Sequence, residues 1–218
     1  MSIQKITIKD KNYPELLKKI YDPPQELYIS GELRKEEKYP IAIVGTRKIS
    51  NYGQEMTRLF AEALAEAGIT IISGLALGVD GLAHRIALEK NSRTIAVLGS
   101  GLNVIYPSAH KELFKKIIES GGAVISEYSP NTSPTKKTFP ARNRIVSGLS
   151  LGVLVIDAPK KSGALITART AIEQGREVFV VPGRINDFNS EGCNYLIKMG
   201  ARLVTDPEEI IESLNIKA

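Results

Sequence analysis

The residues with the clearest chemistry lie in one stretch of high positive charge. Between Tyr128 and Ile172 the chain has seven basic residues and one acidic residue, Asp157, which is a net charge of +6 and leaves 22 basic and 23 acidic residues elsewhere. Such a run of cations can neutralise several phosphates of a polyanion. The seven basic residues are Lys136, Lys137, Arg142, Arg144, Lys160, Lys161 and Arg169.

Phe139 places an aromatic ring within this stretch. It stands in PNTSPTKKTFPARNRIVSG (130–148), whose three prolines and two lysines predict a loop. A ring beside Arg142, Asn143 and Arg144 combines a face on which a base stacks with cations that hold phosphates, which is what a single-stranded nucleic-acid groove needs. Contacts of this kind bring little sequence preference. The alternative is a solvated basic surface with Phe139 in the core.

Two segments with glycine and small polar residues form a second candidate site, SGLALGVDG (73–81) and SGALITA (162–168). At strand-to-helix turns, exposed backbone N–H groups, hydroxyls and the helix dipole favour phosphate or carboxylate. The alternative is close packing of helix on sheet, which also requires glycine. The candidate anion-binding residues at these and neighbouring strand ends are Thr46, Ser73, Gly74, Gly78, Gly99, Gly101, Ser162, Gly163 and Thr167.

Familiar catalytic and cofactor motifs are missing from the sequence. There is no GxGxxG, GxxxxGK[ST] or HExxH, so dinucleotide binding and ATP hydrolysis by the common routes are disfavoured. We expect no metal site and no cofactor, since two histidines and one cysteine give little to ligate a metal. Asp80 and His84, one helical turn apart, are either an acid–base pair or a helix cap and a structural histidine; the second reading is favoured. Cys193 is interpreted as a core residue.

The elements that must position these side chains alternate regularly. Short apolar runs rich in β-branched residues predict strands at 41–45, 69–73, 93–99, 122–128, 152–158 and 176–183, with amphipathic helices between them. This pattern predicts an α/β protein with an extended Rossmann-like fold, a mainly parallel sheet and helices on both faces. Ligands of such sheets bind at the carboxyl ends of the strands. The basic stretch and both glycine segments follow predicted strands and therefore fall at that edge.

Composition and domain organisation agree with a globular protein. The 218 residues are 43% hydrophobic and 24% charged, with a net charge of +5. Residues 1–38, with a helical piece, a Pro-Pro break and a short strand, are expected to form an N-terminal lobe packed on the sheet, and residues 39–218 the Rossmann-like DNA-binding domain, ending in a short helix at 206–214. We expect a cytoplasmic protein, since neither a signal peptide nor a membrane span is visible.

Eight ordered motifs give the chain a strong resemblance to one known family. The string YPIAIVGTR, SGLALGVDGLAH, GSGLNVIYP, SEY, FPARNRIVSGLS, SGALITARTA, VVPG and EGCNYLIKMGA resembles the DprA (Smf) family of DNA-processing proteins, over nearly the whole chain. The resemblance implies non-catalytic binding of single-stranded DNA, protection of incoming strands in natural transformation, help in loading a RecA-type recombinase, and a homodimer.

The resemblance also assigns residues. Arg47 of GTR and Lys136 match the phosphate-contacting positions of the family, and Phe139, Arg142, Asn143 and Arg144 fall in its FPxRNR segment, where Arg144 could instead form a structural pair. With Lys137, these are the expected nucleic-acid-binding residues. By analogy, the dimer surface is expected in the C-terminal part, at Leu196, Ile197 and Met199. The chain resembles a short form without the extra N- and C-terminal domains of many members.

The sequence leaves open the role of Asp157 and two alternative functions. Asp157 stands where Glu is commoner in the family, and its role is undetermined. A nucleotide phosphoribohydrolase of the LOG type, with a similar sheet, is one alternative, but it requires a PGGxGTxxE motif. Here the matching turn reads PKKSGALITARTA, without an acid between Asp157 and Glu173. A nucleotide-sensing domain that uses the same pocket without chemistry is the other alternative.

Overall fold

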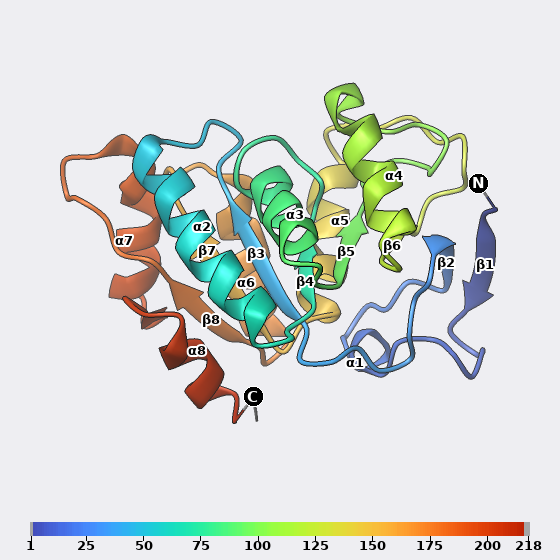
Figure 1. The fold of residues 1–218 in the computed structure, drawn as a ribbon, viewed down its shortest axis with the longest axis horizontal. Coiled ribbons are helices and arrows are strands. Elements are labelled where there is room, and N and C mark those ends of the chain that lie inside the picture. Colours follow the sequence, from blue (N-terminus) through green and yellow to red (C-terminus); the bar gives the residue numbers. More distant parts are fainter. Residues whose placement is uncertain (1, 216–218) are drawn as a thin grey trace.

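The computed structural model describes residues 2–215, which form a nine-stranded sheet with helices on both faces (Figure 1). The strand order is β1-β2-β6-β5-β4-β3-β7-β8-β9. The strands are β1 (Gln4–Thr7), β2 (Glu26–Gly31), β3 (Ile41–Gly45), β4 (Ile71–Ser73), β5 (Thr94–Val97), β6 (Ala123–Ser126), β7 (Gly152–Ile156), β8 (Glu177–Val180) and β9 (Arg202–Leu203). The α-helices are α1 (Glu15–Lys18), α2 (Asn51–Glu66), α3 (Val79–Glu89), α4 (Lys111–Glu119), α5 (Thr138–Gly148), α6 (Gly163–Glu173), α7 (Glu191–Lys198) and α8 (Glu208–Ser213), with short 3-10 helices at Ser108–His110 and Phe188–Ser190.

Seven neighbouring strands, from β6 to β9, run parallel. The chain builds this part in two directions from β3: through β4 and β5 to β6 on one side, and through β7 and β8 to β9 on the other. The strand order therefore reverses between β3 and β7. In open α/β sheets, ligands bind in the crevice outside the carboxyl ends of the strands at such a switch point. The fold thus points to the loops after β3 and β7.

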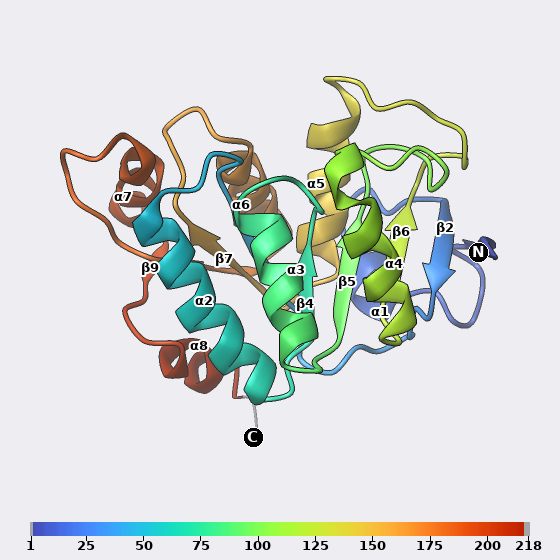
Figure 2. The ribbon, with the colours of Figure 1, turned by 45° about the horizontal axis from the view of Figure 1, so that its top comes forward.

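The continuous apolarity of the central strands reflects burial on both faces. Val153 and Val155 of β7 face one core with α1, α5 and α6, while Leu154 and Ile156 face the other with α2, α3 and α8. A further cluster places α4 over β5 and β6. Figure 2 shows α2, α3 and α4 on the side opposite α5 and α6. Alternating side chains of one strand fill two separate cores, because successive residues of a strand point to opposite faces.

The N-terminal residues join the sheet through its edge. β2 pairs antiparallel with β6, and β1 pairs antiparallel with β2. Leu17 and Ile20 of the α1 region pack in the same core as Ile145 of α5. The expected boundary at residue 38 stays a prediction, but residues 4–31 share both the sheet and its core with the rest of the chain.

The expected α/β fold and its six principal strands are confirmed, although most predicted strands extend one to three residues beyond the observed ends. The prediction of a loop over 130–148 is wrong in its second half, where α5 spans Thr138–Gly148. Pro140 is compatible with this helix because it lies in the first turn, whose N–H groups have no intrahelical acceptor. No helix in the described residues is long and apolar enough to cross a membrane.

Candidate nucleic-acid interface

A cavity of about 390 Å³ lies at the switch point of the sheet. Its walls come from the loop after β3, the loop before α3, the first turns of α5 and α6, and Phe188 after β8. Of the expected site residues it is lined by Thr46, Arg47, Gly74, Phe139, Arg142, Asn143, Ser162, Gly163 and Thr167. Residues far apart in sequence, from both the basic stretch and the glycine segments, therefore meet at one place.

Arg47 and Phe139 lie side by side at this cavity. The guanidinium carbon of Arg47 is 5.1 Å from the centroid of the Phe139 ring, within the range of a cation–π contact. Arg47 is exposed and Phe139 half-buried. None of the ion pairs in residues 2–215 includes Arg47. The arrangement offers a permanently charged, planar donor group next to an apolar face.

The turn that carries Arg47 is fixed by backbone contacts. The N–H of Thr46 donates to the carbonyl of Asp157 (2.8 Å), and the carbonyl of Thr46 accepts from the N–H of Val79 (3.2 Å). A side chain on Gly78 (φ +77°) would collide with the backbone of Thr46 and Arg47. The loops after β3 and β7 and the start of α3 therefore hold Arg47 at the cavity mouth.

Arg142 forms the floor of the cavity. It is 5% exposed, and its Nη1 donates to the carbonyls of Gly74 and Val97. Burial lowers the pKa of Arg142, and the charge of Asp80 opposes that shift. A Cβ on Gly74 would collide with the guanidinium, so glycine is needed there. The guanidinium already donates hydrogen bonds to two carbonyls. A phosphate contact, as expected from the sequence, would have to share this donor group with them.

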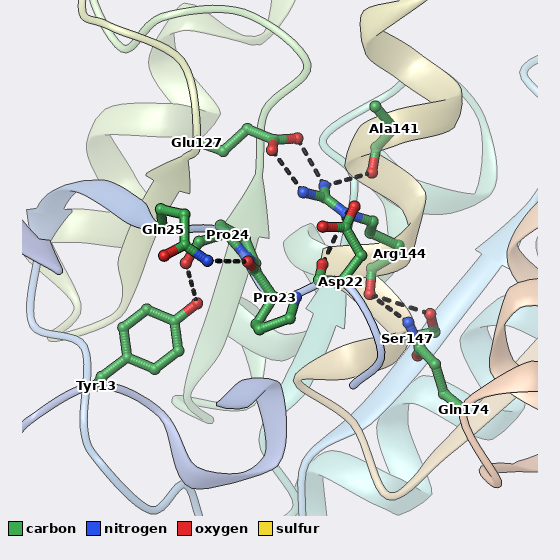
Figure 3. Close-up of polar contacts among 10 residues, drawn as sticks. All are labelled: Tyr13, Asp22, Pro23, Pro24, Gln25, Glu127, Ala141, Arg144, Ser147 and Gln174. Carbon is green, nitrogen blue, oxygen red and sulfur yellow. Dashed lines mark hydrogen bonds and ion pairs between the residues drawn. The ribbon is translucent and has the colours of Figure 1, made fainter. Parts of the chain in front are cut away.

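Arg144, two residues further along α5, points to a different surface. Its Nη1 and Nη2 donate to the two carboxylate oxygens of Glu127 (2.8 and 2.7 Å), and its Nε donates to Asp22 Oδ2 (3.1 Å) (Figure 3). The side chain is 18% exposed. Arg144 thus forms the structural ion pair that the sequence left as an alternative. It connects α5 to Glu127, directly after β6, and to Asp22 in the turn before β2.

Lys136 and Lys137 are exposed on the loop that leads into α5. No carboxylate within residues 2–215 forms an ion pair with either lysine. Asn143 is buried, and its Nδ2 donates to the carbonyl of Gly163 (3.3 Å), which joins α5 to the start of α6. The two lysines remain available to an anion, whereas Asn143 is engaged in joining the two helices.

The anion-binding candidates divide into two groups. Ser162 caps α6 by accepting from the N–H of Ala164 (3.2 Å), and a Cβ on Gly163 would meet nothing within 4 Å, so the amino end of α6 opens into the cavity. The other four do not line it: Ser73, Gly78, Gly99 and Gly101. Ser73 donates to the carbonyl of Ile43, and Gly101 packs on the backbone of Ser129 and Pro130. Gly78, Gly99 and Gly101 thus make the close packing contacts that the alternative describes.

The histidines, Asp80 and Cys193 have structural surroundings. Asp80 Oδ2 accepts from the N–H of Gly74 (3.1 Å), and His84 Nδ1 lies 2.7 Å from Thr94 Oγ1. Burial lowers the pKa of His84 to about 3 and raises that of Cys193 to about 11. Within residues 2–215, no three His, Cys, Asp or Glu side chains are placed to hold a metal ion. The favoured interpretation of Asp80 as a helix cap is wrong in its detail, because Asp80 accepts from the loop before α3 and α3 has no side-chain cap among the described residues.

Sequence reasoning missed two residues near the site, Phe188 and Tyr106, and assigned no role to a third, Asp157. Phe188 lines the cavity and is 69% exposed, and the ring centroid of Tyr106 lies 5.6 Å from that of Phe139. Asp157, whose role was undetermined, has φ +54° and accepts from the N–H of Ser50 (2.7 Å) and from Asn189 Nδ2 (3.3 Å). Burial raises its pKa. Asp157 thereby ties the loops after β3, β7 and β8 together around the cavity.

The three dimer candidates differ in exposure. Leu196 is buried in the core, Ile197 packs partly against it, and Met199 is 67% exposed. Other apolar side chains of α6 and α7 are exposed near the same groove as Met199, namely Ile166, Ile172 and Tyr195. The apolar surface on this side therefore includes residues of α6 that sequence reasoning did not single out.

Comparison with known proteins places the chain in a family. The family model for DNA recombination-mediator protein A matches residues 4–215. Protein Smf of Escherichia coli is 52% identical over 93% of this chain, and DNA processing protein DprA of Streptococcus pneumoniae is 44% identical over 94%. This chain covers 54% of the E. coli protein and 72% of the S. pneumoniae protein. It thus spans about half the length of the E. coli relative.

Two solved structures share the fold closely. The crystal structure of DprA from S. pneumoniae gives a TM-score of 0.89 at 43% identity and covers 96% of this chain and 74% of that one. A structure of Helicobacter pylori DNA processing protein A, described for its single-stranded DNA binding mode, gives a TM-score of 0.87 at 34% identity, with coverage of 98% and 95%. Together with the family model, these similarities show that the chain belongs to the DNA recombination-mediator protein A family, which includes the DprA and Smf proteins.

Proposed function

We propose that the chain binds single-stranded DNA across the carboxyl edge of its sheet. Phosphates are held by Arg47, Lys136 and Lys137, and a base stacks on Phe139. The observation that carries the proposal is the contact of Arg47 with the Phe139 ring, at a cavity on the switch point of the sheet. The description of the H. pylori relative, which names a single-stranded DNA binding mode for that protein, supports the same assignment.

Geometry favours a single strand over a duplex. Phe139 is half-buried at the cavity, so a base reaches its face only when it is not stacked and paired within a helix. Base stacking on aromatic side chains combined with a cationic path for the backbone is the usual mode of single-strand binding without sequence preference. The amino end of α6, with Ser162 and Gly163 at the cavity, adds backbone polarity that favours a phosphate.

The direct test is a fluorescence-anisotropy titration of a labelled oligothymidylate and a labelled duplex of equal length, each at two salt concentrations. We expect the single strand to bind more tightly than the duplex at both salt concentrations. Hydrolysis of a nucleoside monophosphate, assayed in parallel, tests the phosphoribohydrolase alternative. Equal affinity for both DNA forms, or release of free base from the monophosphate, would contradict the proposal.

The proposal extends to assembly and to a partner. We propose a homodimer formed through the exposed apolar side chains of α6 and α7, among them Ile172 (58% exposed) and Met199 (67%). Sedimentation of the wild type and of Ile172→Glu at micromolar concentration tests this, and the variant is expected to be a monomer. A monomeric wild type would contradict it.

Protecting incoming strands in transformation and loading a RecA-type recombinase onto them complete the proposed role, which rests on family membership. The test measures single-strand-dependent ATP hydrolysis by such a recombinase on DNA covered by single-strand-binding protein. Addition of this chain is expected to shorten the lag before hydrolysis begins. An unchanged lag at saturating concentration would contradict the loading role.

A further inference from the structure

Tyr106 lies beside Phe139, although the two residues belong to different parts of the chain. Tyr106 follows β5, and Phe139 opens α5. Their ring centroids are 5.6 Å apart, and the ring planes are tilted by 47°. Rings at this separation touch each other, so a base cannot enter between them. The two rings instead form one continuous aromatic surface, with Arg47 also against Phe139.

The Tyr106 ring is accessible to a ligand. Tyr106 is 47% exposed and, with Arg47, Leu77 and Phe139, lines a small hollow of about 40 Å³ next to the main cavity. Tyrosine rings buried on one face and wet on the other are common in recognition surfaces, because their apolar body and polar tip suit such a position. The exposure of Tyr106 therefore fits a contact with a ligand.

The loop that carries Tyr106 is fastened to the basic loop before α5. The N–H of Gly101 donates to the carbonyl of Thr132 (2.8 Å), the N–H of Asn103 donates to the carbonyl of Pro130 (2.9 Å), and Asn103 Nδ2 donates to Asn131 Oδ1 (2.7 Å). These bonds hold the loop after β5 against the segment that continues into Lys136 and Lys137. The aromatic surface is thus built from two loops that support each other.

We infer that Tyr106 is a second base-stacking residue, which receives the nucleotide next to the one on Phe139. This inference rests on the proposed binding of single-stranded DNA. Arg47 follows β3 and Tyr106 follows β5, two strands away in the sheet. The bound strand therefore crosses the carboxyl edge of the sheet from β3 toward β5, with its bases on the two rings.

Three variants test whether the Tyr106 ring stacks a base: Tyr106→Ala, Tyr106→Phe and the control Tyr21→Ala. Loss of one stacked base corresponds to about a 5- to 150-fold weaker Kd, which is expected for Tyr106→Ala with an oligothymidylate of ten nucleotides. Its slope of log K against log salt stays that of the wild type, because no phosphate contact is lost. Tyr106→Phe keeps the ring and the affinity. Tyr21→Ala removes a fully exposed ring that lines neither the cavity nor the hollow; it is the control and leaves the Kd unchanged.

The chain has no tryptophan, so a single introduced indole reports on its own position. Tyr106→Trp fluorescence is expected to be quenched on addition of the oligonucleotide, with a midpoint equal to the Kd from anisotropy. Tyr21→Trp serves as the control, because Tyr21 is fully exposed and lines neither the cavity nor the hollow. No quenching of Tyr106→Trp at saturation would overturn the inference.

The outcomes distinguish this inference from the proposed function. If Tyr106→Ala binds like the wild type while Arg47→Ala binds weakly, DNA occupies the site but does not reach Tyr106. If neither variant changes the Kd, the strand binds elsewhere and both proposals fail. A salt slope that falls in Tyr106→Ala would show that the loop contacts phosphate, which also contradicts the stacking role.

Discussion

The guanidinium of Arg47 lies 5.1 Å from the centre of the Phe139 ring, although β4, β5 and β6 lie between the two residues in sequence. Arg47 comes from the loop after β3 and Phe139 from the first turn of α5. In the proposed binding mode, this contact places a phosphate-binding group beside a base-stacking face. Substitutions at these two residues and at their neighbours distinguish DNA binding from structural roles.

Replacing Arg47 by Ala is expected to remove a phosphate contact without affecting the fold. Each lost contact with a single strand lowers the slope of log K against log salt by about 0.7. The loss should be the same for oligothymidylate and oligodeoxyadenylate, since phosphates carry no sequence information. Arg47→Lys, which keeps the charge but not the planar fork, should retain the slope with weaker binding. An unchanged slope in Arg47→Ala would show that its guanidinium does not contact the backbone.

Phe139→Ala is expected to weaken DNA binding by about 1–3 kcal/mol, the usual cost of one lost stacked base. The melting temperature should change little, because the ring is half-buried at the cavity mouth and is absent from the three core clusters. Anisotropy and thermal unfolding of the same preparation measure both effects. A large fall in melting temperature with unchanged affinity would assign Phe139 to the core.

Arg142→Ala should act mainly on stability. The substitution leaves the buried carbonyls of Gly74 and Val97 without their donor and removes the cation near buried Asp80, which costs roughly 1–3 kcal/mol or more. Urea unfolding measures this loss. At a temperature where the variant is folded, its salt slope should match that of the wild type. If the slope drops as in Arg47→Ala while stability is retained, Arg142 contacts phosphate directly.

Arg144→Ala tests the connection between α5 and the N-terminal residues. The variant loses a bidentate pair with Glu127 that is largely shielded from solvent, and we expect a loss of roughly 1–3 kcal/mol in unfolding free energy. Asp22→Ala is the matched control, because the Asp22 side chain is 74% exposed and such surface pairs contribute about 0–1 kcal/mol. Equal effects of the two substitutions would contradict the dominance of the Glu127 pair.

Stability is expected to fall as the pH drops below about 6.5. Burial lowers the pKa of His84 from 6.5 to about 3, and burial also lowers that of His110. Below pH 6.5 the unfolded chain therefore binds protons that the folded chain does not. Each histidine then lowers the free energy of unfolding by up to about 1.4 kcal/mol per pH unit, until its folded pKa is reached. Urea unfolding of the wild type and His84→Gln between pH 7 and 5 checks this. The variant should show a shallower decline, and an identical one would contradict it.

The fold was more predictable than the site. The apolar runs of β3 and β7 predict buried strands, because neither face of the sheet meets water there. The start of α5 was not predicted, because the sequence does not distinguish Pro140 in the first turn of a helix from a proline in a loop. Arg142 and Arg144 are equivalent in sequence, yet the helix turns them to different surroundings. Tyr106 gave no local signal, and the position of Asp157 after a strand did not define its role, because both roles arise from loops that only the sheet order brings together.

Photocrosslinking tests the central claim most directly. An oligothymidylate with one 5-iodouracil is irradiated in complex with the chain, and the modified peptides are identified by mass spectrometry. The account predicts that the crosslinked peptides contain Phe139 or Tyr106 and that Arg47→Ala reduces their yield. Crosslinks confined to peptides away from the carboxyl edge of the sheet, such as those of α2 or α8, would contradict it.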